Sequence, residues 1–310
     1  MEKIKIIYIT GYGRSGGTLV GRLLGDTKKA FFIGELRNFW KYGILKNHVC
    51  SCGQKFDTCD FWGKVADEYI KSFPSVNIEE ISKEFREFKK LKNYFKLKKI
   101  MGNSYDNKLK IFLDKYLYHN EKLFEIISKV SGKNILVSSS RIPGRLFALS
   151  FSDKLEIYPV FLLRDPRGVL NSMIQFDKRL FGEYRHNALK QLASWNSNTL
   201  LSVQIMNKIT QGKFLLNLYS GFTKNPDREL EHLKKLLDDE LDYTQKNEQI
   251  FINLHSGHIF AGNQMRFKSG NVSINQDLKW DQQLSPKNKV LASVISLPLY
   301  RYVANKYYNN

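Results

Sequence analysis

The sequence predicts an α/β fold in which helices flank a central parallel sheet. Short apolar runs recur along the chain, and each is followed by a turn or polar corner and then by a helical pattern. These runs lie at 3–9, 31–33, 134–138, 157–163 and 213–219. Strands that alternate with helices in this way are typical of a parallel sheet covered by helices.

The first run leads into a glycine-rich loop, Thr10-Gly-Tyr-Gly-Arg-Ser-Gly-Gly-Thr18, and then into a helical pattern. Glycines allow positive φ angles and a close approach to a ligand, and the free N–H groups of the following helix point back into the loop. The loop therefore predicts a P-loop-like anion site made of Gly13, Arg14, Ser15, Gly16, Gly17 and Thr18. The alternative is a turn that only joins a strand to a helix.

The loop lacks the Gly-Lys-Ser/Thr ending of a nucleoside-triphosphatase P-loop, in which the hydroxyl holds Mg²⁺ and the lysine reaches the terminal phosphates. Arg14 and Ser15 occupy the central place instead. Arginine stays charged and presents a fixed fork of donors, so it can neutralise an ester oxygen without a metal. This predicts phosphate recognition without magnesium.

The composition predicts one globular domain over 1–310, with a helical cap inserted at about 61–131 where apolar residues repeat at helical spacing. The hydrophobic fraction is 42%, and the formal net charge of +19 implies an anionic partner. Candidates are a phosphorylated small molecule, a polyanionic saccharide, an acidic membrane surface or nucleic acid.

Within 81–100, eight basic residues stand against two acidic ones. This basic face predicts either a docking surface for an acidic acceptor or membrane, or an ordinary solvated helix face. The sequence has no recognisable secretory signal and no apolar run of about 18 residues, so we expect a cytoplasmic protein.

A second anion site is predicted where the apolar run 157–163 ends, at Arg164-Asp-Pro-Arg-Gly-Val-Leu-Asn-Ser172. Asp165 suits a helix N-cap, and Pro166 suits the first helical turn. Ser172 follows Arg164 by eight positions, which is about two helical turns. The arginine and the hydroxyl could therefore hold one phosphate together.

Three motifs in this order resemble the P-loop-type sulfotransferases, particularly bacterial relatives of the carbohydrate and tyrosylprotein enzymes. They are the loop Gly11–Thr18, the Arg164/Ser172 pair and the late segment His255–Gly270, and the resemblance covers most of the chain outside about 64–130. It implies that the loop binds the 5′-phosphosulfate of 3′-phosphoadenosine 5′-phosphosulfate (PAPS), and that Arg164 and Ser172 bind its 3′-phosphate. The product nucleotide would be adenosine 3′,5′-bisphosphate (PAP).

The resemblance also implies an acceptor with a hydroxyl group, in a saccharide, lipid, peptide or small metabolite. Phe31-Phe-Ile-Gly-Glu35 resembles the second strand of the family, which ends in Gly-Glu, so Glu35 is the candidate catalytic base. An acceptor hydroxyl must lose its proton as it attacks sulfur, and a carboxylate beside the anion loop can take it. The alternative is a structural glutamate paired with Arg37 or Arg14.

Ile135-Leu-Val-Ser-Ser-Ser-Arg141-Ile-Pro143 resembles a strand followed by Asp-Ser-Ser-Lys-x-Pro in the family. Here Ser138 replaces the aspartate and Arg141 the lysine. The resemblance implies that the cation of Arg141 stabilises charge on the transferring group. Ser139 and Ser140 either hydrogen bond the donor or acceptor, or cap the next helix.

Tyr219 corresponds to a strand-end tyrosine that contacts the adenine in relatives. In the late segment, Arg266 and Gly270 resemble the loop that closes over the 3′-phosphate, and Asn263 is expected to fix that loop. For His255 and His258 we expect a structural, loop-anchoring role.

The cysteines Cys50, Cys52 and Cys59 form one cluster, and an odd clustered set is not a secreted disulfide framework. With His48 they could supply four zinc ligands, but the spacing differs from common zinc patterns. Cys-Ser-Cys-Gly with Cys-Asp-Phe-Trp also resembles bacterial sulfotransferases, which implies a shared structural element. We therefore predict no metal.

The sequence favours a sulfotransferase over two other classes. A nucleotide kinase or other P-loop phosphotransferase would show metal-dependent ATP turnover. A non-enzymatic polyanion-binding protein would bind DNA or RNA with strong salt dependence and would not respond to PAP. We expect a nucleotide donor and a hydroxyl acceptor as partners, with no nucleic acid.

Overall fold

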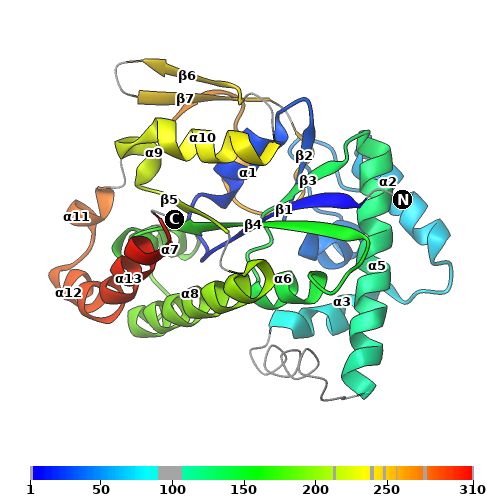
Figure 1. The fold of residues 1–310 in the computed structure, drawn as a ribbon, viewed down its shortest axis with the longest axis horizontal. Helices are drawn as coiled ribbons and strands as arrows, with labels where there is room; N and C mark the ends of the chain where they lie inside the picture. Colours follow the sequence, from blue (N-terminus) through cyan, green and yellow to red (C-terminus); the bar gives the residue numbers. More distant parts are fainter. Residues whose placement is uncertain are drawn as a thin grey trace.

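A five-stranded parallel sheet forms the centre of the protein (Figure 1). The structure is a computed structural model, and it describes residues 3–89, 107–211, 214–237, 241–246, 249–255, 257–274 and 278–308. The strand order is β2-β3-β1-β4-β5. Its strands are β1 (Ile4–Thr10), β2 (Ala30–Gly34), β3 (Ile135–Ser138), β4 (Leu155–Leu163) and β5 (Leu215–Leu218). The predicted strands are present, and the α/β fold class is confirmed.

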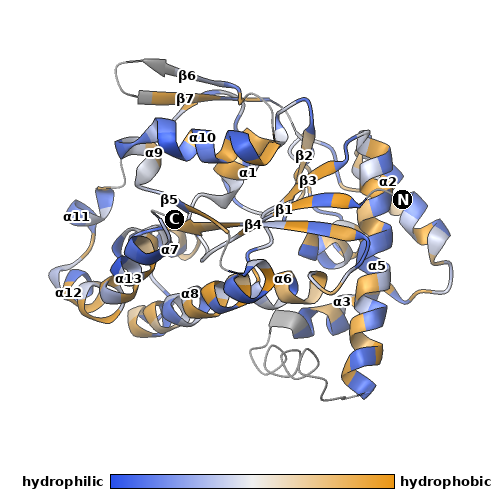
Figure 2. Cartoon of the chain, viewed as in Figure 1, coloured by the Kyte–Doolittle hydropathy of each residue, from blue (hydrophilic) through white to orange (hydrophobic). Residues whose placement is uncertain are grey.

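Both faces of the sheet are buried, which explains why its strands read as continuous apolar runs rather than as alternating ones. In β1, Ile6 and Tyr8 belong to one core cluster, and Ile7 and Ile9 belong to the other. Helices α1 (Gly17–Gly25) and α10 (Pro226–Leu237) cover one face, and α5 (Asn107–Ser131) and α6 (Pro143–Leu149) cover the other (Figure 1). Figure 2 shows hydrophobic residues concentrated on the strands and on the helix faces turned toward them.

The described part of the predicted cap region, 61–131, is helical. It contains α2 (Trp62–Ser72), α3 (Ile78–Glu84), the short 3₁₀ helix η3 (Phe85–Lys89) and α5. Helix α5 also packs against β1 and β3, with Leu123, Phe124 and Ile127 buried, so it forms part of the layer that covers the sheet. Much of the predicted basic face lies outside the described residues, namely Lys90, Lys92, Lys96, Lys98 and Lys99.

The second half of the chain adds helices beside the sheet and a small antiparallel sheet in the order β6-β7-β8. The helices are α7 (Pro166–Phe181), α8 (Ala188–Thr210), α9 (Gly221–Lys224), α11 (Lys279–Gln283), α12 (Pro286–Ile295) and α13 (Leu297–Tyr307). The strands of the small sheet are β6 (Tyr243–Lys246), β7 (Gln249–Leu254) and β8 (Gly270–Ser273). Within the described ranges, no helix is long and apolar enough to cross a membrane.

The strand order places the predicted site residues at one edge of the sheet. Strands β2 and β3 lie on one side of β1, and β4 and β5 lie on the other, so the order of the strands reverses beside β1. Ligands of open α/β sheets bind outside the carboxyl ends of the strands at such a reversal. Because all five strands are parallel, the segments that follow them meet at this edge.

Candidate active site

Two glycines of the loop after β1 have backbone conformations that a larger residue would strain. Gly11 has a φ of 124°, and a Cβ at this position would lie 2.3 Å from the carbonyl oxygen of Leu162 in β4. Gly16 has a φ of 92° and is the N-cap of α1. Arg14 is also left-handed, with a φ of 72°, which costs about 1–3 kcal/mol for a residue other than glycine. The surrounding structure must hold this arginine in place.

A cavity of about 930 Å³ opens at the carboxyl edge of the sheet. It brings together most of the predicted site residues: Gly13, Arg14, Gly16, Gly17, Thr18, Glu35, Arg141, Arg164, Ser172, Tyr219, Asn263 and Arg266. Two predicted residues do not line it. Ser15 is buried at 4% exposure, and Gly270 begins β8. Among the described lining residues, seven side chains are lysine or arginine and one is a carboxylate.

Arg14 contacts both parts of the predicted second anion site. Its Nε donates to Ser172 Oγ at 3.0 Å, and the Arg164 guanidinium donates to the Arg14 carbonyl oxygen. The Arg164 guanidinium also lies 4.4 Å from the centre of the Tyr219 ring. The loop after β1 and the segments after β4 and β5 therefore form one site.

Arg164 stands directly before the start of α7, where Asp165 is the N-cap. Asp165 caps the helix by accepting from the Arg167 N–H at 2.8 Å, and Pro166 stands in the first turn, as the sequence predicted. The Arg167 side chain also pairs with the Asp165 carboxylate, at 2.6 Å. Asp165 is thereby occupied by its neighbour, while Arg164 lines the cavity.

The cations around Arg14 are crowded. Burial lowers the pKa of Arg14, and the charges of Arg164 and Arg141 lower it further. No carboxylate of the described chain forms an ion pair with Arg14. Bringing like charges together is unfavourable unless an anion balances them, so this part of the cavity is suited to a polyanion.

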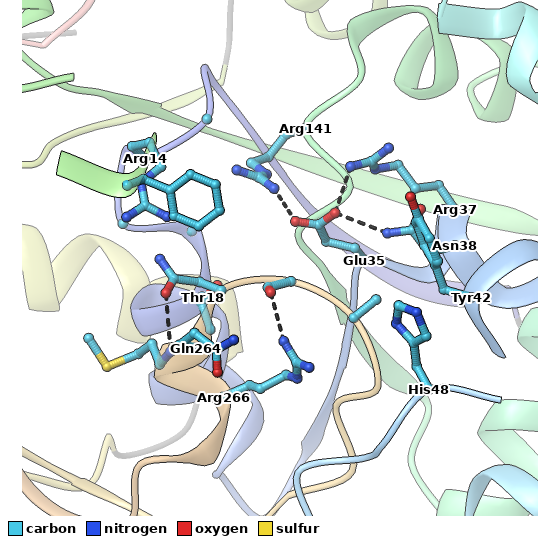
Figure 3. Close-up of a pocket in the computed structure, with 18 of the residues that line it drawn as sticks. Arg14, Thr18, Glu35, Arg37, Asn38, Tyr42, His48, Arg141, Gln264 and Arg266 are labelled. Atoms are coloured by element: carbon cyan, nitrogen blue, oxygen red, sulfur yellow. Dashed lines mark hydrogen bonds and ion pairs between the residues drawn. The ribbon is translucent and has the colours of Figure 1, made fainter. Parts of the chain in front are cut away.

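Glu35 is the carboxylate of the cavity, and its side chain is surrounded by donors (Figure 3). Arg37 Nη2 lies 2.6 Å from Glu35 Oε2, Asn38 Nδ2 donates to the same oxygen at 3.1 Å, and Arg141 forms an ion pair with Oε1. Of the two structural partners considered from the sequence, Arg37 pairs with Glu35, whereas Arg14 bonds Ser172 instead.

The arginines keep Glu35 ionised. Burial raises the pKa of this carboxyl, but the charges of Arg141 and Arg37 and their hydrogen bonds outweigh burial, so the pKa falls below its ordinary value of 4.5. Arg141 has a φ of 54°, and its Nη1 lies 3.4 Å from the position of a Cβ on Gly13. This side chain therefore connects the carboxylate to the glycine-rich loop.

The sequence motifs do not mark the residues that follow Glu35 as part of the cavity. The 3₁₀ helix η1 (Leu36–Asn38) and the π-helix η2 (Phe39–Leu45) carry Asn38 and Tyr42 into it. His48 follows, and its ring stacks on Tyr42 with 4.7 Å between the centres. Burial lowers the pKa of His48, and the charges of Arg266 and Lys46 lower it further, so its imidazole is neutral at pH 7. π-Helices occur frequently at functional sites, but nothing local in this segment signals one.

The late segment closes one side of the cavity, and Arg22 of α1 holds it there. The Arg22 side chain is 2% exposed and donates to the carbonyl oxygens of His255, Met265 and Lys268. The sequence signal for this contact is an arginine within the apolar pattern of α1.

Within the late segment, Asn263 caps the 3₁₀ helix η4 (Gln264–Phe267) by accepting from the Met265 N–H at 3.2 Å. Arg266 donates to the Gly262 carbonyl oxygen at 2.8 Å. Gly262 has a φ of 125°, and a Cβ there would lie 3.7 Å from Glu35 Oε1. The segment therefore approaches the catalytic-base candidate through its backbone (Figure 3).

Fold and site together define a P-loop-like α/β protein with a cationic cavity at the carboxyl edge of its sheet. No family model matches the sequence, and no curated protein matches it. Solved structures that are similar to it include three sulfotransferases. The sulfotransferase domain of the Synechococcus PCC 7002 olefin synthase is 13% identical, with 94% of each chain covered and a TM-score of 0.48.

The sulfotransferase domain of the curacin biosynthetic pathway is 14% identical, with 95% of this chain and 97% of that chain covered and a TM-score of 0.47. Sulfotransferase STF9 from Mycobacterium avium is 11% identical, with 80% of this chain and 65% of that chain covered and a TM-score of 0.44.

Proposed function

We propose that this protein is a sulfotransferase that moves a sulfuryl group from PAPS to the hydroxyl of an acceptor. One observation carries the proposal: a single cavity combines a crowd of arginines around a glycine-rich loop with one ionised carboxylate. The arginines suit a donor with several negative charges. The carboxylate suits an acceptor that must lose a proton.

The residues present fit such a donor. Three buried polar atoms have no hydrogen-bond partner among the described residues. Thr10 Oγ1 and Ser15 Oγ belong to the loop, and Arg266 Nε belongs to the late segment. The loop N–H groups and Arg14 would hold the 5′-phosphosulfate, and Arg164 and Ser172 would hold the 3′-phosphate. The Tyr219 ring borders Gly16, where a Cβ would approach it to 2.9 Å, so it stands beside the loop as an adenine contact requires. Asn263, Arg266 and Gly270 would close over the nucleotide.

In this mechanism Glu35 accepts the proton of the acceptor hydroxyl as that oxygen forms its bond to sulfur and the bond from sulfur to the 5′-phosphate oxygen breaks. PAPS supplies the sulfuryl group. A hydroxyl proton becomes strongly acidic once its oxygen bonds sulfur, so a carboxylate of low pKa can accept it late in the step. Arg14 stabilises the charge that develops on the departing phosphate, and Arg141 orients Glu35.

Arginines can take the place of Mg²⁺ in this chemistry. A sulfuryl group carries less negative charge than a phosphoryl group, which usually needs metal ions to neutralise its oxygens. The cavity offers Arg14 of the glycine-rich loop for that purpose, with Arg141 beside the loop at Gly13. A hydroxyl of a saccharide, lipid, peptide or small metabolite would approach from the side of Glu35.

The test incubates the purified protein with ³⁵S-labelled PAPS and fractionated cell extract, without added Mg²⁺, and identifies the labelled species by mass spectrometry. We expect transfer to an acceptor, no increase on adding Mg²⁺, and a raised melting temperature with PAP. The Arg14→Ala variant is the control and should show transfer that is strongly reduced. Absence of transfer and of stabilisation by PAP, together with Mg²⁺-dependent ATP turnover, would overturn the proposal in favour of a phosphotransferase.

A further inference from the structure

Outside the cavity, the three cysteines meet a histidine from the other end of the chain. The sulfur atoms of Cys50, Cys52 and Cys59 and a ring nitrogen of His258 all lie within 4.8 Å of one another. Cys52 Sγ and Cys59 Sγ are 3.6 Å apart, and Cys59 Sγ and His258 Nδ1 are 3.2 Å apart. Each thiol is free rather than part of a disulfide.

The Cys52–Cys59 and Cys59–His258 separations are close to those of a tetrahedral metal site. With Zn–S bonds of about 2.3 Å and a Zn–N bond of about 2.0–2.1 Å, tetrahedral geometry places two sulfur ligands about 3.8 Å apart and a sulfur and a nitrogen about 3.5 Å apart. A disulfide would need about 2.05 Å between its sulfurs. Three thiolates and one imidazole are among the ligand sets of structural zinc sites.

The cluster is also packed into its surroundings. Cys59 stands just before α2 and is 1% exposed, and Cys50 is fully buried. The His258 ring lies against the Phe61 ring, with 5.5 Å between the centres. The cluster is therefore part of a packed region.

We propose that Cys50, Cys52, Cys59 and His258 bind one structural Zn²⁺ ion. Four protein ligands complete a tetrahedral shell and leave no open position for a substrate, which distinguishes this site from a catalytic one. This site differs from the sequence expectation in two ways. The fourth ligand would be His258 rather than His48, which lines the cavity, and the site would hold a metal where the sequence predicts none. His258 keeps its expected anchoring role, exerted through the metal.

The zinc would fasten the late segment of the chain to the segment that follows η2. Hydrogen bonds already join the two segments: Ser51 Oγ accepts from the Ile259 N–H at 2.8 Å, and Trp62 Nε1 donates to the His258 carbonyl oxygen at 2.7 Å. Ala261 and Gly262 follow within a few residues and line the cavity. The ion would thus hold in place the segment that carries Arg266 toward the donor site.

The first test measures metal in the full chain, expressed with zinc in the medium and purified without chelator. Elemental mass spectrometry should find about one zinc ion per chain, and the zinc content of Cys59→Ser and His258→Ala should be near zero. His255→Ala is the matched control, because this histidine lies three positions before His258 and pairs with Asp242 at the surface, at 2.9 Å. It should keep its zinc.

A second test on the unmodified chain remains informative if the variants fail to fold. Exchange of the metal for Co²⁺ should give the visible absorption of tetrahedral thiolate coordination, and a mercurial that blocks thiols should release zinc to a colorimetric indicator. A chain without zinc and without the cobalt spectrum, a Cys52–Cys59 disulfide in peptide maps, or full zinc content in His258→Ala would overturn the site.

The consequence for the cavity is measured separately and rests on the proposed function. Removal of zinc should weaken PAP binding at least several-fold, with recovery when zinc is restored; unchanged binding would refute the link to the late segment. Because metal content is measured without any nucleotide, failure of the zinc site and failure of the sulfotransferase proposal give different results.

Discussion

The cavity has two halves that balance their charges in different ways. In the loop half, formed by Arg14, Arg164, Ser172 and Tyr219, cations approach one another and Arg14 has no carboxylate partner among the described residues. In the carboxylate half, around Glu35, two arginines and an asparagine surround one buried acid. Around Arg14 the described residues supply no countercharge, whereas around Glu35 one carboxylate offsets one of the two arginine charges.

This difference separates binding from chemistry. A site with excess positive charge gains most from a ligand that stays anionic throughout, which is the role proposed for the donor nucleotide. A carboxylate that is held by arginines can change its protonation state when the hydroxyl of an acceptor approaches it. Arg141 is the connection between the halves, since it pairs with Glu35 and its guanidinium lies close to Gly13. Substitutions in the two halves should therefore have separable effects.

The largest effect is expected for Glu35→Gln. Loss of a general base lowers turnover by about 10²–10⁴-fold, while PAP binding should stay nearly the same because the loop half is intact. Transfer of ³⁵S and calorimetric titration with PAP measure the two quantities. Glu125→Gln serves as control, since this glutamate is 62% exposed and pairs with Lys122 on the surface. A normal turnover rate would remove Glu35 from the mechanism.

Arg14→Ala should come next, with turnover lower by about 10²–10³-fold, the usual loss when one donor to a developing charge is removed. Arg14→Lys should recover only part of it, because lysine keeps the charge but not the fork of donors. Arg185→Ala is the control, since that side chain is 55% exposed and pairs with Glu183. Single-turnover kinetics with saturating donor would measure the effect. A change in donor affinity alone would assign Arg14 to binding only.

Arg164→Ala should weaken PAP binding by about 10- to 100-fold, which corresponds to the loss of one or two hydrogen bonds to a charged group. Binding of adenosine 5′-monophosphate, which lacks the 3′-phosphate, should change far less. Arg167→Ala is the matched control, because Arg167 lies three positions after Arg164. Its side chain pairs with Asp165, and its Cζ lies 4.0 Å from the centre of the Trp280 ring. Equal losses for both nucleotides would contradict the 3′-phosphate role.

The two halves also differ in how far the sequence predicts them. The loop half is built from local motifs: glycines required by the backbone between β1 and α1, and the Asp165 and Pro166 signals at the start of α7. Its residues follow strand ends, so a parallel sheet brings them together. Even there, the left-handed φ of Arg14 runs against its local preference and depends on the surrounding fold.

The carboxylate half depends on contacts between distant parts of the chain. Glu35 was predicted from its strand end, but its ion pair with Arg141 joins residues 106 positions apart. The closure by Gly262 joins segments about 200 positions apart or more, and so does the cluster of Cys59 with His258 outside the cavity. No local pattern contains such pairings, because tertiary packing creates them. For the same reason His48 was considered beside the cysteines, whereas it lies in the cavity.

The smallest expected effect concerns His48, the second group of the carboxylate half that could accept a proton. A base must be deprotonated to act, so activity falls as the pH drops through its pKa. The pKa of Glu35 lies below 4.5, so with Glu35 as base kcat/KM should stay level from neutral pH down to that region. His48→Ala should then lower turnover by less than about tenfold, or 1.4 kcal/mol. His186→Ala, at a histidine that pairs with Asp177 away from the cavity, is the control. The opposite result would be a fall in kcat/KM that already begins between pH 6.5 and 4.5. If His48→Ala removed both this pH dependence and most of the turnover, the role of base would belong to His48.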